Sequence, residues 1–432
     1  MYNLITLPNG LRVAIENIDY VNSVSVGLWI ENGSRNENTY NNGISHFLEH
    51  MFFKGTINRT SKKIVEEIED VGGQVNAFTG KEATCFYIKI LDSYLELSMD
   101  ILADMLFNSS FKEEEILKEK GVIIEEISMS EDSPEDTISD LHSLAIWGDD
   151  PISLPILGTI ETVNSFTRNQ LLEYLALHYI PKNSVLSISG KINMADVEKL
   201  VQKYFGHWGL DRLEKTSYTS PVILKNNYYK YKSIEQLHVS LGLKGIETGQ
   251  DDIYSLLVLC NIFGGGASSI LFQKVREEKG LCYSIYSYIS SFKNTGVVNI
   301  YTSLNPLYIK DAMELIYNEV VKFSKDNISI ERINKTKEQI KGNYILGLES
   351  TSSRMFSNGK SVLFQNFINT PDILIGKVNK IDKTSIARVI EKTFSLGILN
   401  SAFVGEKFDM GMIKSFWEGD IVAFKDKKSR RV

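Results

Sequence analysis

Two histidines and a glutamate lie within five residues of one another in the stretch His46-Phe-Leu-Glu-His50. In an α-helix, residues four apart lie on one face, so His46 and His50 can direct two imidazole nitrogens at a single metal ion. Glu49 lies beside them and has the carboxylate that a general base requires. The same residue types also occur on solvated helix faces that bind nothing. Because catalytic zinc takes three protein ligands and a water, a third ligand decides between these interpretations.

Carboxylates that could be the third ligand are plentiful in the helix expected over residues 113–129. Glu119 and Glu126 are seven residues apart, which places them two turns apart on one helix face. Both offer an oxygen that zinc accepts, so their spacing alone does not choose between them.

The segments around these residues mix strand and helix patterns without a regular alternation of the two. Short apolar or alternating runs predict strands, and apolar residues at helical spacing predict helices. The predicted strands are residues 4–7, 11–15, 24–30, 74–79, 83–90 and 184–189. The predicted helices are residues 44–53, 61–71, 95–107, 113–129, 167–179 and 194–204. This order favours an α+β fold over a doubly wound parallel sheet.

The second half of the chain repeats the plan of the first. Val239-Ser-Leu-Gly-Leu243 resembles Val24-Ser-Val-Gly-Leu28 at an offset of 215 residues (239 − 24). The helix opening near Glu331 resembles that at Glu113 at an offset of 218 (331 − 113). Offsets near half the chain length indicate two homologous domains. Residues 256–266, which take the place of the metal helix, contain no histidine, so the metal site should belong to the first domain alone.

The expected domains are residues 1–210 and 233–432, each a largely antiparallel sheet packed by helices. A linker is expected over residues 211–232, which contain Pro221 and a polar run. A chain of 432 residues is too long for one ordinary core, which agrees with a division of this kind.

Composition and charge exclude several classes of protein. With 43% apolar and 23% charged residues, the chain is expected to be a soluble globular protein. Its net charge of −7 argues against nucleic acid as the main partner, because phosphate binding requires a concentrated basic face. The basic run at residues 425–431 is interpreted as a solvated end of the chain.

The cysteines and the apolar runs indicate the compartment. Cys85, Cys260 and Cys282 are odd in number and widely spaced, which is typical of reduced thiols in a cytoplasmic protein. The first residues lack the basic and apolar regions of a signal peptide, and no run of 18 apolar residues occurs. We therefore expect neither export nor membrane insertion.

The metal motif resembles that of a known family. His46-Phe-Leu-Glu-His50 resembles the inverted zinc motif of the inverzincins, and its extension through Gly55-Thr56 is similar to the pitrilysin, insulysin and mitochondrial processing peptidase family. Val122-Ile-Ile-Glu-Glu126-Ile resembles the family's second signature, and the resemblance covers nearly the whole chain. It implies a zinc metalloendopeptidase that binds one Zn²⁺ per chain.

The resemblance also implies a role for each residue of the site. His46, His50 and Glu126 would hold zinc, Glu49 would be the general base, and Glu119 would match the family's supporting glutamate. Zinc held in this way lowers the pKa of a bound water from about 15.7 toward 7 and polarises the scissile carbonyl.

A substrate site is implied further along the first domain. Gln74-Val-Asn-Ala-Phe-Thr79 has the pattern of an ordinary strand end, but it is similar to the family's substrate-binding edge. Asn76, Ala77 and Phe78 would there meet an extended peptide by strand addition.

The second domain contains a glycine-rich segment, Phe263-Gly-Gly-Gly-Ala-Ser-Ser-Ile270. It lacks the Lys-Ser/Thr ending of a phosphate-binding loop, which argues against a nucleotide site. The family has a glycine-rich loop here, often with an arginine where this chain has Ile270. Arg276 and Tyr283 resemble the family's arginine and tyrosine pair, which would anchor substrate and donate to the developing oxyanion.

Chains of this length in the family carry two domains and pair as a clamshell around a chamber. The resemblance therefore implies a homodimer, or a heterodimer with a related chain, whose substrates are short or unstructured peptides. The alternative is a non-catalytic or partner-dependent structural subunit. Such subunits usually lack a metal residue, and this chain lacks none.

Overall fold

The computed structural model describes residues 1–209, 217–416 and 419–424. The chain folds into two compact units, each built from three stretches of sequence. The first unit comprises Met1–Ser128, Leu154–Ser217 and Asn343–Leu374, and the second comprises Met129–Ser153, Tyr218–Gly342 and Ile375–Val432. The basic run at 425–431 and residues 210–216 of the expected linker region lie outside the described residues.

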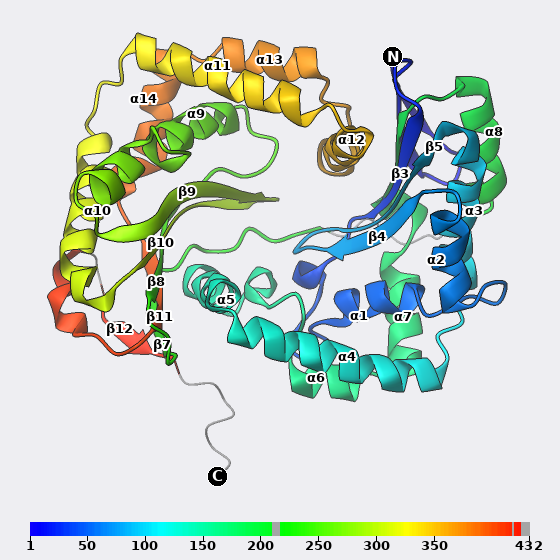
Figure 1. Cartoon of the computed structure of the whole chain (residues 1–432), viewed down its shortest axis with the longest axis horizontal. Helices are drawn as coiled ribbons and strands as arrows, with labels where there is room; N and C mark the ends of the chain where they lie inside the picture. Colours follow the sequence, from blue (N-terminus) through cyan, green and yellow to red (C-terminus); the bar gives the residue numbers. More distant parts are fainter. Residues whose placement is uncertain (210–216, 417–418, 425–432) are drawn as a thin grey trace. The chain divides into compact units, whose positions relative to one another are not determined.

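The first unit is organised around a mixed sheet of six strands in the order β1-β2-β6-β3-β5-β4 (Figure 1). All neighbours are antiparallel except β2 and β6, which are parallel. Strand β4 lies at one edge and pairs with β5 alone. The strands are β1 Tyr2–Thr6, β2 Arg12–Asn17, β3 Ser23–Ile30, β4 Gln74–Thr79, β5 Thr84–Leu91 and β6 Ser184–Gly190.

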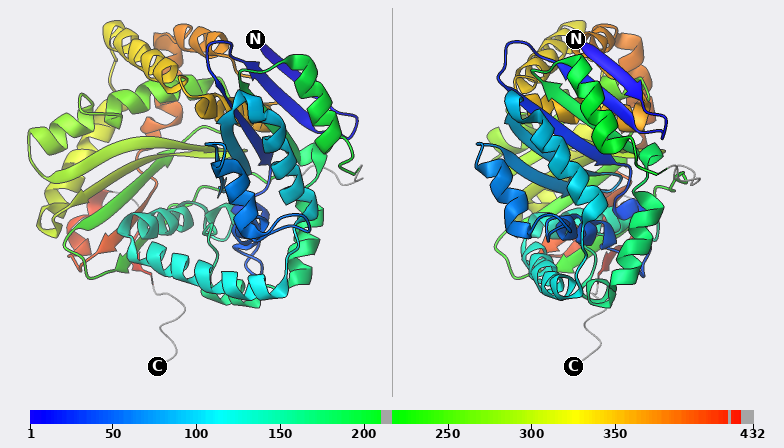
Figure 2. Two further views of the ribbon diagram at one scale, coloured as in Figure 1. Left: turned by 45° about the vertical axis from the view of Figure 1, so that its right-hand side comes forward. Right: turned by 90° about the vertical axis from the view of Figure 1, so that its right-hand side faces the viewer.

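Helices cover one face of this sheet and bury its larger core. The face carries the alternate residues Val13, Leu28 and Phe86, which lie in a single cluster with helix residues such as Phe47 and Leu102. Figure 2 shows α3 and α8 side by side along the sheet. The helices are α1 Ile44–Phe52, α2 Ser61–Glu69, α3 Leu95–Asn108, α4 Glu113–Asp132, α6 Ile160–Ser165, α7 Arg168–His178 and α8 Met194–Phe205.

The opposite face of the first sheet is covered by α12, Thr351–Gln365, from the second half of the sequence. The strand residues between the core positions, such as Ala14, Trp29 and Cys85, form a second cluster with Val362 and Leu363 of this helix. Helix α5, Pro134–Trp147, comes from the first half of the sequence but packs on β8 and β11 of the second unit. Each half of the sequence thus supplies a helix to the sheet of the other.

The second unit repeats the sheet in the order β12-β7-β11-β8-β10-β9 (Figure 1). Its run β7-β11-β8-β10-β9 corresponds strand for strand to β2-β6-β3-β5-β4, which supports the predicted duplication. The pairs β12–β7 and β7–β11 are parallel and the others antiparallel. The strands are β7 Asn227–Tyr231, β8 Leu237–Lys244, β9 Cys282–Phe292, β10 Thr295–Leu304, β11 Asn400–Gly405 and β12 Ile421–Ala423.

The α+β prediction is confirmed, since each unit is a mixed, mainly antiparallel sheet packed by helices. Strand β7 lies inside the range 211–232 that the sequence suggested as a linker. Within the described chain, no helix combines the length and the apolar character needed to cross a membrane. The helices of the second half, apart from α12, are α9 Asp252–Gly264, α10 Ile309–Phe323, α11 Ile330–Gly347, α13 Pro371–Asn379 and α14 Lys383–Lys392.

Polar contacts hold α12 on the first sheet. Glu16 of β2 is 3% exposed and accepts hydrogen bonds from Arg354 and from Asn358 Nδ2, the latter at 2.8 Å. Arg12 Nη1 donates to the carbonyl oxygen of Val362 at 2.9 Å, near the carboxyl end of the helix, where a cation is favoured. A strand and a helix that are far apart in sequence are thereby fixed in register.

The approach of α12 to β3 is close enough to require glycine. A Cβ on Gly359 would lie 2.2 Å from Trp29 Nε1. We expect Gly359→Ala to lower the free energy of unfolding by about 1–3 kcal/mol through overpacking, seen as a lower melting temperature.

The control for this change is Gly342→Ala in α11, where a Cβ would meet nothing within 4 Å. Alanine is the better helix former, so this control should melt at or above the wild-type temperature. A Gly359→Ala chain that melts like the control would contradict the close packing.

Candidate metal centre

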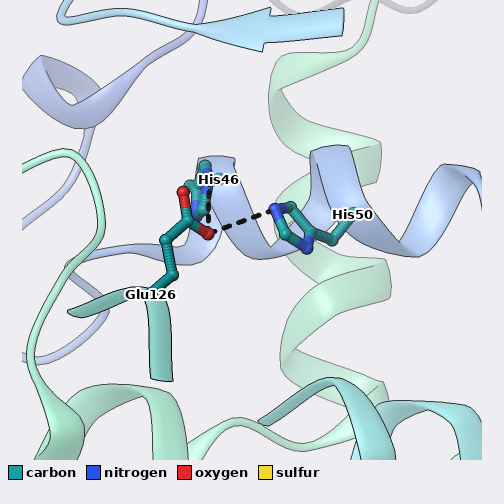
Figure 3. A group of neighbouring side chains, drawn as sticks. All are labelled: His46, His50 and Glu126. Carbon is teal, nitrogen blue, oxygen red and sulfur yellow. Dashed lines mark ion pairs between the residues drawn. The ribbon is translucent and has the colours of Figure 1, made fainter. Parts of the chain in front are cut away.

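Helices α1 and α4 bring together the three residues that the sequence offers as metal ligands. One carboxylate oxygen of Glu126 lies 3.7 Å from His46 Nε2 and 3.6 Å from His50 Nε2 (Figure 3). One donor atom from each residue lies within 4.8 Å of the other two. Donors bound tetrahedrally at about 2.0–2.2 Å from zinc would be about 3.3–3.6 Å apart. The two nitrogens and the oxygen are therefore of the right type for a small divalent cation, and the oxygen lies close to the expected distance from each nitrogen.

The orientation of His50 is fixed by Glu119. The Nδ1 atom of His50 lies 2.7 Å from Glu119 Oε1, and Lys54 Nζ lies 2.6 Å from Glu119 Oε2. Burial opposes ionisation of Glu119, but the hydrogen bonds from His50 and Lys54 outweigh it and lower its pKa. An ionised carboxylate only accepts, so Nδ1 carries the proton and leaves the Nε2 lone pair free for a metal. Glu119 is therefore placed behind a ligand, and Glu126 faces both histidines.

His46 is held in a different environment. Burial and the neighbouring His50 lower its pKa to about 3, so the ring is neutral at physiological pH. Its Nδ1 atom is buried and has no hydrogen-bond partner among the described residues. Neutral imidazole is the form that binds zinc, and only the Nε2 side of the ring faces Glu126.

Glu49 lies on the same helix but outside the group of three. Its carboxylate accepts a hydrogen bond from the hydroxyl of Thr79 at the end of β4. Burial raises the pKa of Glu49, against the opposing effects of Thr79 and His50. The contact joins the helix that bears the histidines to the edge strand of the sheet. Thr79 was not among the residues that the sequence suggested, because a threonine at a strand end has no signature.

Glu37 is a second residue that the sequence did not suggest. Its carboxylate accepts hydrogen bonds from the backbone N–H of Gly43 at 2.7 Å and of Ser45 at 2.9 Å. Helix α1 has Gly43, at φ 94°, as its N-cap, so no residue of the helix itself can provide a side-chain cap. Burial raises the pKa of Glu37, against the effect of these hydrogen bonds. A carboxylate that comes six residues before Gly43 thus satisfies two backbone N–H groups at the start of α1.

Thr56, the last residue of the extended metal motif, has a structural role. The Thr56 hydroxyl donates to Asp104 Oδ2 at 2.7 Å, and Arg59 Nη1 donates to the same oxygen at 3.0 Å. Burial opposes ionisation of Asp104, but its hydrogen bonds, including one from Asn58, outweigh it and lower its pKa. This network fixes the turn after α1 to α3.

The predicted substrate residues lie on β4 at the edge of the sheet. Asn76 and Phe78 are exposed and Ala77 is half-buried. The side-chain oxygen of Asn76 accepts a hydrogen bond from the Ala77 N–H at 2.8 Å. The Ala77 N–H is therefore directed away from β5, as strand addition at this edge requires.

Arg276 and Tyr283 lie in the second unit and contact each other. Arg276 belongs to η5, the helical turn Phe272–Glu277, and Tyr283 to the start of β9. The Arg276 guanidinium carbon lies 5.0 Å from the centre of the Tyr283 ring, which is 72% exposed. The first unit thus brings together the histidines and glutamates of the candidate site, and Arg276 and Tyr283 contact each other within the second unit.

Residues 12–160 match the insulinase family, peptidase family M16, and residues 165–340 match the M16 peptidase inactive domain. The chain is 42% identical over 390 residues to a Bacillus subtilis protein named "Uncharacterized zinc protease YmxG", covering 90% of this chain and 95% of that one. An "Uncharacterized zinc protease" of Rickettsia felis is 36% identical over 94% of this chain and 97% of its own. The chain therefore belongs to the insulinase family.

Two solved structures share the fold. A protease from Helicobacter pylori superposes with a TM-score of 0.86 at 23% identity, over 94% of this chain and 99% of that one. A structure from Pseudomonas fluorescens, described as a peptidase M16 inactive domain, gives 0.87 at 15% identity, over 94% and 98% of the two chains. At these identities the likeness concerns the fold alone.

The support of His50 by Glu119 has a measurable consequence. Replacing Glu119 by Gln removes the anionic acceptor behind the imidazole and should weaken zinc binding about 10–100-fold. Competition with a chromophoric zinc chelator measures the affinity. Glu125→Gln, on the exposed side of the same helix, is the matched control and should leave it unchanged. Equal affinities in the two variants would remove Glu119 from the metal centre.

Proposed function

We propose that this chain is a zinc-dependent endopeptidase that cleaves short or unstructured peptides, with one zinc ion per chain bound by His46, His50 and Glu126. The observation that carries the proposal is the convergence of these three donors, with Glu49 on the same helix as the two histidines. The names of its relatives, which describe them as zinc proteases, support the same activity. The protein would act in the cytoplasm.

The residues of the first unit have distinct roles in peptide hydrolysis. When bound, zinc polarises the scissile carbonyl and lowers the pKa of a coordinated water toward about 7. Glu49 takes the proton from the attacking water and delivers it to the leaving amine. The Thr79 hydroxyl holds the Glu49 carboxylate in place, so the base and the edge strand are positioned together.

Substrate is bound as an added strand beside β4. The exposed edge and the outward Ala77 N–H can pair with the main chain of an extended peptide. Main-chain hydrogen bonds do not depend on side-chain identity, so many sequences can bind. A folded domain has few free extended segments, which explains the preference for short or unstructured chains.

Arg276 and Tyr283 of the second unit complete the site of peptide hydrolysis. A guanidinium anchors substrate carbonyl or carboxylate groups, and a phenol donates to the oxygen on which negative charge develops. In the proposed homodimer, this pair comes from one subunit and the zinc ligands from the other. A related chain could replace one subunit, giving a heterodimer.

Glu49→Gln separates chemistry from metal binding. The variant should retain about one zinc per chain, because the ligands are untouched, and lose peptidase activity by about 100-fold or more. Zinc is measured by atomic emission and cleavage with an internally quenched peptide library, with chelated enzyme as a blank. Cleavage at a rate close to wild type would remove Glu49 as the base. A wild-type chain that binds zinc but cleaves only with another subunit present would favour the structural-subunit alternative.

Sharing of the site between subunits is tested by mixing two inactive chains. Glu49→Gln lacks the base and Tyr283→Phe lacks the phenol, so each alone should be inactive. Random pairing makes half of the dimers mixed, each with one intact site, so activity should return to about a quarter of the wild-type level. Absence of recovery in dimers shown to be mixed would argue that each chain completes its own site.

A further inference from the structure

Four aromatic rings gather at the substrate edge of the first unit, on the face away from the metal helix. They are Trp29 of β3, Phe78 of β4, Tyr87 of β5 and Phe356 of α12. The Phe356 ring lies 4.8 Å from that of Tyr87, 5.8 Å from that of Phe78 and 6.1 Å from that of Trp29, between centroids. The Trp29 and Phe78 rings are 5.5 Å apart.

Strand β4 directs its side chains alternately to two faces. Ala77 packs toward the main core, and Thr79 reaches the Glu49 carboxylate. Phe78 points the other way, into the aromatic group, and remains 39% exposed. A peptide added beside β4 would follow the same alternation, so every second side chain would lie on the aromatic face.

We propose that Trp29, Phe78, Tyr87 and Phe356 form a side-chain subsite for a large apolar residue of the bound peptide, and that Phe356 determines its selectivity. The proposal rests on the proposed peptidase function and on strand addition at β4. A residue of an added strand opposite Phe78 would have its Cβ about 4.5–5.5 Å from that of Phe78, within reach of the exposed ring. Aromatic and large aliphatic side chains gain most from such a contact.

Phe356 is suited to this role because contacts between its helix and the sheet fix its position. Its helix is held by the contacts of Arg354 and Asn358 with Glu16, on either side of Phe356 in the sequence. The Phe356 ring packs edge-to-face against both Phe78 and Tyr87, on the side of Phe78 that faces the sheet-covering helix. Leucine at this position would let the Phe78 ring withdraw and make the subsite shallower.

The metal-free half of the sequence would thereby contribute to specificity through α12. Phe356 touches none of the residues proposed to bind zinc, so its replacement should leave the metal and the base in place. The replacement should weaken the binding of one substrate side chain, and it should therefore change KM more than kcat.

The test compares peptides that differ by Phe or Ser at one position, scanned across the cleavage site. In the wild type, kcat/KM should favour Phe at a position facing the aromatic group. Phe356→Leu should reduce that preference about three- to tenfold, mainly through KM, with zinc content unchanged. Peptide dissociation constants in a Glu49→Gln background give the same readout without turnover.

Phe364→Leu is the matched control. Phe364 lies two turns further along α12 and packs against the cluster around Val362. It should keep the wild-type preference. An unchanged preference in Phe356→Leu, or an equal loss in both variants, would overturn the role of Phe356. A wild-type enzyme that cleaves peptides without any Phe preference would overturn the subsite and leave the peptidase function standing. Absence of zinc-dependent cleavage and peptide binding would instead refute the function itself.

Discussion

The candidate metal centre is built around the buried carboxylate of Glu119. It accepts from His50 Nδ1 on one oxygen and pairs with Lys54 on the other, at 2.7 and 2.6 Å. A buried anion requires partners of this kind, because desolvation without them would force it to take up a proton. The arrangement turns the second nitrogen of His50 toward Glu126. The same carboxylate thus satisfies its own burial and sets the orientation of a ligand.

The remainder of the first unit fixes α1, which carries the two candidate histidine ligands, relative to the edge strand β4. Glu37 caps the amino end of α1, and Thr79 connects Glu49 to β4. Because side chains alternate along a strand, β4 faces the metal helix with one set and the aromatic group with the other. Chemistry and side-chain selection can therefore occupy opposite faces of one edge strand. The second half of the sequence takes part through α12, although none of its described residues belongs to the candidate metal group.

Local periodicity in the sequence predicts a good part of this arrangement. The i, i+4 spacing of His46 and His50 is sufficient to place both on one helix face, and the repeated strand motif predicts the second sheet. Spacing could not choose between Glu119 and Glu126, since both lie on one face of α4. The distinction depends on the atoms that they approach, since Glu119 lies at Nδ1 of His50 and Glu126 lies near Nε2 of both histidines.

The contacts made by Glu37, Thr79 and α12 left no signal of that kind in the sequence. Glu37 acts on α1 through a turn of irregular backbone, and Thr79 is an ordinary strand residue. The docking of α12 on β2 and β3 connects residues more than 300 positions apart, such as Glu16 and Asn358, through polar groups without periodicity. Such contacts depend on the assembled sheet, so they follow from the fold and cannot be deduced from either segment alone.

The most direct measurement is anomalous diffraction at the zinc edge from crystals of the purified protein. The account predicts one peak per chain in the first unit, about 2.0–2.2 Å from His46 Nε2, His50 Nε2 and a carboxylate oxygen of Glu126. A peak on other residues, or a metal held by Glu119 in place of Glu126, would contradict it.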